Sequence, residues 1–186
     1  MATLEEAYSI VSDLTAKLRM PPPQIMVSPP KVPLYSPSAF LGRDGLRISP
    51  EALDQLSVGQ LRICLAYAIV NSQAAKKSSN IVFALCLAVI LPFGTIYTLT
   101  TAEGSSGLPG WFWPAAVFGL ALYFFAGYLV ALRTARQTDS GVFGITNDLP
   151  GIREYLLAGG YYKKSGVPVV PKPGSVEKRL ANLQGF

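Results

Sequence analysis

The sequence predicts an α+β membrane protein: a small domain of helices and short strands, a two-helix transmembrane hairpin and an extended C-terminal tail. Three observations support this. Helical and β-type patterns alternate near the N-terminus, two long charge-free runs fill the middle, and prolines interrupt the end. With 186 residues, half of them hydrophobic, the chain can form one small core plus membrane-spanning helices. We expect boundaries at 1–79 and 133–166 for the two halves of the domain, 80–132 for the hairpin and 167–186 for the tail.

The first element is an amphipathic helix that starts after Thr3 and ends near Arg19. Thr3 and Glu6 have capping-box spacing, and apolar residues then recur at helical intervals. Three prolines at 21–23 forbid continuation of the helix. Residues 24–28 are typical of a short strand.

A β-hairpin is expected over residues 36–48, because Asp44-Gly45 lies between two alternating apolar segments. An exposed edge strand can accept an added strand through main-chain hydrogen bonds. The first strand is therefore a possible edge for a peptide or partner, formed by Ser38, Ala39, Phe40 and Leu41. The alternative, which we favour, is an ordinary hairpin that closes a small sheet.

Two helix starts follow each other closely. Ser49-Pro50 combines an N-cap residue with a proline in the first turn, and Ser57 with Gln60 forms a second capping-box pattern. Apolar residues then recur at helical spacing from Leu61 to Ile69. This predicts a short helix and then a longer one over residues 57–77.

The run I-S-P-E-A-L-D-Q-L-S-V-G-Q-L-R-I-C-L-A-Y-A-I-V-N resembles the HtpX-type membrane zinc metalloproteases. In that family the same frame ends in L-A-H-E-L-G-H, which supplies two zinc ligands and the general base. Here Tyr67-Ala68-Ile69-Val70-Asn71 replaces H-E-x-x-H. Tyr67 takes the place of the first histidine, Ala68 that of the glutamate and Asn71 that of the second histidine. The resemblance covers about residues 4–156.

The third zinc ligand is also replaced. The segment R-T-A-R-Q-T-D-S resembles the family's third-ligand segment; if Asp139 matches the family's aspartate, Ala135 stands where the ligand glutamate would be. A register shifted by one residue would place Arg136 there instead. Neither side chain binds zinc, and the chain has no histidine at all. The resemblance therefore implies no catalytic site and no metal.

We expect side chains to fill the vacated metal site. Tyr67 and Asn71 lie one turn apart on the same helix face. A buried hydroxyl and a buried amide need hydrogen-bond partners. We therefore expect them to bond to each other, to backbone, or to groups on residues 133–146.

Two spans are predicted at residues 81–100 and 112–132, with an outer loop at 101–111. Each run is uncharged and long enough to cross the roughly 30 Å hydrocarbon core. Of the 16 Lys and Arg residues, eight precede the first span and eight follow the second. The positive-inside rule then places both termini in the cytoplasm, at the inner or plasma membrane if the organism is bacterial.

The C-terminal tail is expected to become ordered on another protein. Prolines at 168, 171 and 173 remove backbone donors, and the apolar residues are too few for an independent core. Ser175 is expected to cap a short helix that ends at Leu183. The predicted partner-binding residues are Val169, Val170, Leu180, Leu183 and Phe186.

These features predict a catalytically inactive, metalloprotease-like structural or accessory subunit of a larger photosynthetic, respiratory or proteolytic membrane complex. One alternative is a pseudoprotease that captures peptides for an active membrane protease or regulates it. Another is an enzyme of unrelated mechanism, but Cys64 without a histidine base would be a poor nucleophile. We predict no cofactor and no nucleic acid. The expected partners are other membrane-protein subunits and the lipid bilayer.

Overall fold

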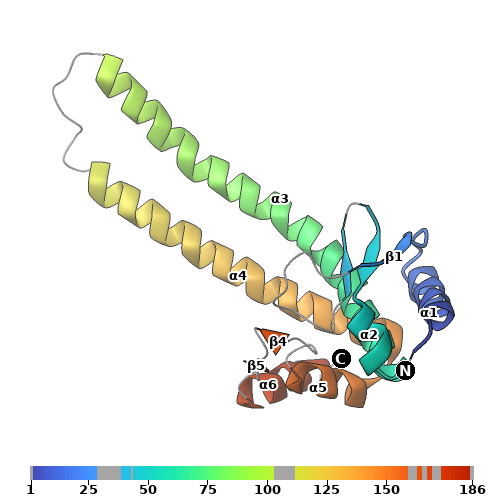
Figure 1. Ribbon diagram of the computed structural model, residues 1–186. Helices are drawn as coiled ribbons and strands as arrows, with labels where there is room; N and C mark the ends of the chain where they lie inside the picture. The colour runs from blue at the N-terminus through green and yellow to red at the C-terminus, as the bar shows by residue number, and fades with distance from the viewer. Residues whose placement is uncertain are drawn as a thin grey trace. The chain divides into compact units, whose positions relative to one another are not determined.

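A computed structural model describes residues 2–28, 39–42, 44–102, 112–158, 163–164, 167–168 and 173–184 (Figure 1). The chain divides into two units. Unit 1 comprises Met1–Ala74 and Arg136–Phe186, and unit 2 comprises Ala75–Ala135. The expected tail at 167–186 therefore shares a unit with both halves of the small domain.

Helix α1 (Leu4–Lys17) begins at the predicted capping box. The Thr3 backbone N–H donates to Glu6 Oε2 at 2.7 Å, and the Glu6 N–H donates to Thr3 Oγ1 at 3.2 Å. The helix buries one apolar face, formed by Ala7, Ile10, Val11 and Leu14. The predicted amphipathic helix is confirmed.

A three-stranded sheet follows, with strand order β1-β3-β2. Strand β3 (Leu46–Ile48) pairs in parallel with β1 (Ile25–Val27) and antiparallel with β2 (Ala39–Leu41). The turn requires glycine at residue 45, where φ is 133° and a Cβ would lie 2.4 Å from the Gln24 carbonyl oxygen. The predicted hairpin and short strand are confirmed. Ser38 lies outside the described residues.

Helix α2 (Pro50–Gln55) and helix α3 (Val58–Ala102) start where the sequence predicts. Ser49 Oγ accepts from the Ala52 N–H at 3.2 Å. The Ser57 N–H donates to Gln60 Oε1 at 3.0 Å, and the Gln60 N–H donates to Ser57 Oγ at 3.3 Å. These capping interactions fix the residues at which α2 and α3 begin.

The C-terminal part of unit 1 is formed by the end of α4 (Phe112–Thr146), α5 (Leu149–Leu157) and α6 (Pro173–Gln184). Helix α6 begins at Pro173, so the predicted cap at Ser175 is wrong; proline fits the first turn of a helix, where its missing N–H has no partner to lose. Strands β4 (Lys163–Lys164) and β5 (Val167–Pro168) form a short antiparallel pair. Pro168 is thus compatible with a strand of two residues, because proline is tolerated in edge strands.

One hydrophobic core joins the helices and sheet of unit 1. Its fully buried side chains come from α1, β3, α3, α4, α5 and α6, and the largest are Leu14, Leu46, Ile48, Leu61, Ile63, Leu65, Ile69 and Ile152. Val142 of α4 and Val176 of α6 are also fully buried. The core therefore includes the last helix of the chain.

Unit 2 contains residues 75–102 of α3 and residues 112–135 of α4. Among the described residues, one helix, α4, is long and apolar enough to cross a membrane. None of its most apolar window is buried, and its large side chains are exposed, among them Trp113, Val117, Phe118, Leu120, Phe124 and Phe125. This finding supports one of the two predicted spans.

Both long helices continue through the predicted domain boundaries at residues 79–80 and 132–133. Helix α3 continues from the site helix through residues 81–100 and past Pro92, and α4 continues from residues 112–132 through Thr146. Residues 60–91 contain neither glycine nor proline, so nothing in the sequence ends α3 between its polar and apolar parts.

Candidate functional site

The candidate site is a polar cluster inside unit 1. The Tyr67 hydroxyl of α3 donates to Asp139 Oδ1 of α4 at 2.9 Å. The Arg179 guanidinium of α6 binds both carboxylate oxygens, with Nε donating to Oδ2 at 2.7 Å and Nη2 to Oδ1 at 2.6 Å. We call these three residues the Tyr67–Asp139–Arg179 cluster. It links three helices that are far apart in the sequence.

A second tyrosine packs against Tyr67 of the cluster. The ring of Tyr155, on α5, stacks on Tyr67 with the ring centroids 4.3 Å apart and an interplanar angle of 14°. Both tyrosines are buried. Such a stacked pair contributes packing that each ring alone would not. Helices α3, α4, α5 and α6 thus all contribute to one site.

Burial makes the charge on Asp139 important, because this residue is only 2% exposed. A buried carboxylate is costly unless it is paired and hydrogen-bonded. Here its two oxygens accept three hydrogen bonds, two of them from a guanidinium. The bidentate geometry is the strongest that arginine offers to a carboxylate.

The same interactions fix the protonation of the two partners. Burial raises the pKa of the Tyr67 hydroxyl, and the charge on Asp139 raises it further, so the hydroxyl stays a donor. For Arg179, burial disfavours the charged form, but the hydrogen bonds and charge of Asp139 outweigh it and raise the guanidinium pKa. The cluster is therefore a neutral hydroxyl with an ion pair.

This arrangement is unsuited to holding a metal ion. A protonated guanidinium has donors and no lone pair for a metal, and its positive charge occupies the only carboxylate of the cluster. Across the part of the chain that the structure describes, no three His, Cys, Asp or Glu side chains gather in a metal-binding group. The cluster provides structural cross-linking between helices.

Cys64, one turn before Ala68 on α3, is buried in the core. Burial raises the pKa of its thiol to about 12, against a smaller lowering by the Ala39 backbone hydrogen bond. A thiol reacts as the thiolate, so a raised pKa keeps it inert near neutral pH. The sequence also lacks a histidine that could act as its base.

No family model, no curated protein and no solved structure matches the chain. The likeness to the HtpX-type proteases therefore remains an interpretation of the residues quoted from the sequence.

The predicted site residues divide into two groups. Tyr67 does bond to a residue on 133–146, as predicted, and that residue is Asp139. Asn71, in contrast, is exposed, so the prediction of a buried amide is wrong. Its neighbours Val70 and Ala74 are buried, so the side chain of Asn71 projects from the covered part of α3. Ala68 is half-buried, and Ala135 is exposed.

Sequence reasoning missed Arg179 and Tyr155. A signal for Arg179 existed, because it lies within the apolar stripe of α6, three residues after Val176 and four before Leu183. A cation on a buried face needs an anion, and Asp139 was the residue without an assigned partner. Tyr155 carried no comparable signal, since a tyrosine on an amphipathic helix is common.

The predicted partner-binding tail is wrong for Leu180 and Leu183. Both are buried in the core of unit 1, together with Val176. The reason is that α6 has its own apolar face and packs beside α5, so the tail finds its burial within the chain (Figure 1). Val169, Val170 and Phe186 lie outside the described residues.

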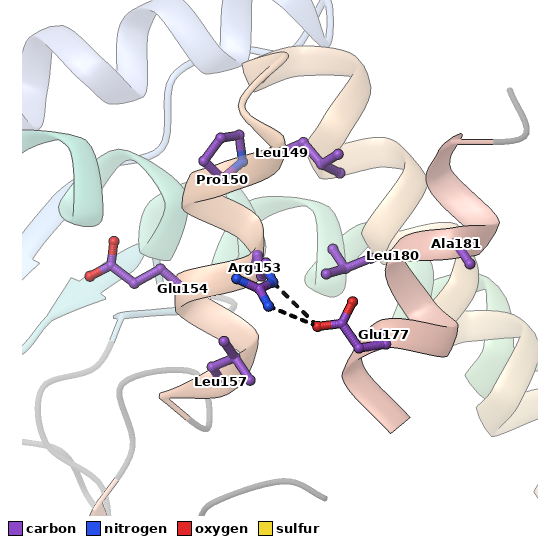
Figure 2. Close-up of a pocket in the computed structure, with 8 residues that line it drawn as sticks. All are labelled: Leu149, Pro150, Arg153, Glu154, Leu157, Glu177, Leu180 and Ala181. Carbon is purple, nitrogen blue, oxygen red and sulfur yellow. Dashed lines mark hydrogen bonds and ion pairs between the residues drawn. The ribbon is translucent and has the colours of Figure 1, made fainter. Parts of the chain in front are cut away.

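A groove of about 740 Å³ lies between α5 and α6 (Figure 2). An ion pair bridges the two helices there, with Arg153 Nη2 3.0 Å from Glu177 Oε1. The other side chains along it are Leu149, Pro150, Glu154, Leu157, Leu180 and Ala181. The Arg153–Glu177 pair is exposed and adds little stability by itself.

The expected peptide edge is strand β2, which lies at one side of the sheet. The register pairs Ala39 with Ile48 and Leu41 with Leu46. The Ala39 backbone, however, lies beside the Cys64 thiol of α3, where it lowers the pKa of that thiol. Part of this strand is thus engaged by the same chain.

Proposed function

We propose that this protein is a catalytically inactive, metalloprotease-like membrane protein that serves as a structural or accessory subunit of a larger membrane complex. The observation that carries the proposal is the Tyr67–Asp139–Arg179 cluster. It occupies the helix position at which the resembled family binds its metal. Where that family needs ligands and a base, this chain has a hydroxyl, a carboxylate and a guanidinium that satisfy one another.

The position of Asp139 supports the likeness to a metal site. Histidine ligands of a metal usually donate their second N–H to a carboxylate. Tyr67 stands at the first histidine position and donates to Asp139, so the hydrogen bond from site helix to carboxylate is present. Ala135 and Arg136 lie four and three residues before Asp139, so both share its helix face and both registers fit this reading.

A membrane location follows from the exposed apolar surface of unit 2. Helix α4 presents large apolar side chains that a soluble protein would bury. We infer that α3 and α4 cross the bilayer as a hairpin with both termini in the cytoplasm. The distribution of all 16 Lys and Arg residues on the terminal sides of the two runs supports this orientation.

Two experiments test the function. Full-length protein, extracted from its native membrane in mild detergent, should co-purify with other membrane subunits; recovery of the monomer alone would contradict the subunit role. Purified protein should cleave no peptide or casein substrate, with or without added zinc. Zinc-dependent cleavage that Tyr67→Ala abolishes would contradict the inactive assignment.

The second candidate function is peptide capture by β2, which the edge position of this strand favours. Binding by strand addition uses outward main-chain groups of residues such as Leu41. A proline at residue 41 would remove its N–H and weaken capture, while leaving the opposite strand intact. Equal peptide binding by Leu41→Pro and the unchanged protein would exclude this candidate, provided that both remain folded.

A further inference from the structure

Lys76 and Arg133 lie at the same level of unit 2, on different helices. The hydroxyls of Ser78 on α3 and Thr134 on α4 are in contact and set this level. Lys76 precedes Ser78 by two residues, and Arg133 precedes Thr134 by one. At 1.5 Å per residue, both cations start within about 3 Å of the contact along their helices.

The second observation concerns the acidic partners that the described residues offer to these two cations. Both side chains are exposed, and neither takes part in an ion pair with any residue that the structure describes. Helix α3 contains no Asp or Glu, and the single acid on α4 is Asp139, which is paired with Arg179. The positive charge at this level is therefore not neutralised by the elements that carry it.

The level coincides with the edge of the apolar runs. Arg133 directly follows the run 112–132, and Lys76 precedes the run 81–100 by about 7 Å of helix. A headgroup layer is about 5–7 Å thick on each side of the hydrocarbon core. Long basic side chains from this level reach the depth at which lipid phosphates lie.

We propose that Lys76 and Arg133 form a basic collar that binds the headgroup phosphate of anionic phospholipids on the side of the termini. The proposal rests on the membrane hairpin proposed above. Unpaired cations at headgroup depth complement a phosphodiester, and the surface of an anionic leaflet attracts such residues. The partner is the lipid, because the collar adjoins the hydrocarbon region.

The test uses the full chain in membranes made of equal parts phosphatidylcholine and phosphatidylglycerol. After extraction in mild detergent, mass spectrometry measures the ratio of the two lipids that remain bound. The unchanged protein should be enriched in phosphatidylglycerol. Lys76→Gln and Arg133→Gln should each lower that enrichment by about fivefold.

A matched control removes the same charge elsewhere. Arg153→Gln with Lys178→Gln neutralises two exposed cations on α5 and α6 and should leave the enrichment unchanged. A loss in the control equal to that in Lys76→Gln with Arg133→Gln would overturn the collar, because general charge would then explain it. Enrichment abolished by an excess of inorganic phosphate would also overturn it, in favour of a soluble phosphate site.

Membranes of phosphatidylcholine alone separate this inference from the proposed hairpin. A protein that inserts into them but shows no lipid preference in the mixture would overturn the collar and leave the hairpin standing. A protein that fails to insert into them would overturn both.

Discussion

Asp139 accepts every hydrogen bond that holds the Tyr67–Asp139–Arg179 cluster together. It is an acid in the interior of unit 1, and its neighbours supply a hydroxyl and a guanidinium. A buried ion pair of this kind adds little net stability over a well-packed apolar pair, but removal of one partner is costly. Its importance therefore lies in specifying how α3, α4 and α6 meet.

Removal of the guanidinium should destabilise unit 1 strongly. Arg179→Ala leaves the Asp139 carboxylate buried with only the Tyr67 hydroxyl as a hydrogen-bonding partner from the cluster. We expect the free energy of unfolding to fall by about 3 kcal/mol, at the lower end for such a change, since Arg179 is partly exposed and water can replace it. Urea unfolding of the full chain in mild detergent measures this loss.

The neighbouring Lys178 provides the control, because it is exposed on the same helix. Lys178→Ala should change the free energy of unfolding by less than about 0.5 kcal/mol. Arg179→Leu should lose stability as Arg179→Ala does. The double variant Arg179→Leu with Asp139→Leu should recover much of that loss, since the buried charge is then gone. Equal destabilisation by Arg179→Ala and Lys178→Ala would show that the ion pair is not a structural link.

Ionisation of Cys64 should lower the free energy of unfolding at alkaline pH. Burial raises the pKa of its thiol from 9.0 to about 12, so the folded chain keeps a proton that the unfolded chain loses. The free energy of unfolding should be unaffected below about pH 9 and should fall as the pH rises from 9 toward 12. In Cys64→Ala this part of the fall should vanish, as urea unfolding at several pH values would show. An unchanged slope in that variant would contradict the assignment.

At the scale of elements, local signals were sufficient for the helix starts and the hairpin. The caps at Thr3, Ser49 and Ser57 and the turn at Gly45 depend on residues within four positions of each other. The position of α6 could not be predicted in this way. Its burial depends on α4 and α5, and no short-range pattern in a proline-rich segment indicates which surface will cover it.

The difference between local signals and long-range packing also explains which residues of the site could be predicted. Tyr67 was singled out because it stands where the resembled family has its first histidine, and its partner was predicted within residues 133–146. Asn71 is exposed although Val70 before it and Ala74 after it are buried, and spacing alone cannot tell which positions other helices cover. Arg179 needed knowledge of the long-range packing of α6.

Deletion of α6 should therefore disrupt unit 1. Loss of residues 173–186 uncovers the core around Val176 and Leu180 and removes the guanidinium from Asp139. We expect amide hydrogen exchange in α5 and in the end of α4 to become much faster. Deletion of 185–186 alone is the control and should have little effect. Unchanged protection of α5 in the longer deletion would contradict the packing described for α6.

At the scale of the whole molecule, charge distribution predicts orientation. Residues 101–111 contain no Lys or Arg, so the proposed hairpin should expose this loop on the outer side. A membrane-impermeant maleimide applied to intact cells should label Ser105→Cys and leave Lys178→Cys unlabelled until the membrane is opened. Labelling of Lys178→Cys in intact cells would reverse the orientation.

We propose that the Tyr67–Asp139–Arg179 cluster stands in a former zinc site, and restoring the zinc ligands would test this proposal. Tyr67→His, Ala68→Glu, Asn71→His and Ala135→Glu rebuild H-E-x-x-H and the third ligand, and Arg179→Gln removes the cation that would repel zinc. Two imidazoles one helical turn apart with a glutamate form a common zinc site. The control moves the second histidine off this face, with Ser72→His in place of Asn71→His.

Zinc bound per chain, measured by equilibrium dialysis on protein whose circular dichroism confirms folding, decides the question. We predict one zinc per chain for the restored protein and substantially less for the control, because residues 67 and 72 are five positions apart and project from different faces of the helix. A folded restored protein that binds no more zinc than the control would contradict descent from a metal site.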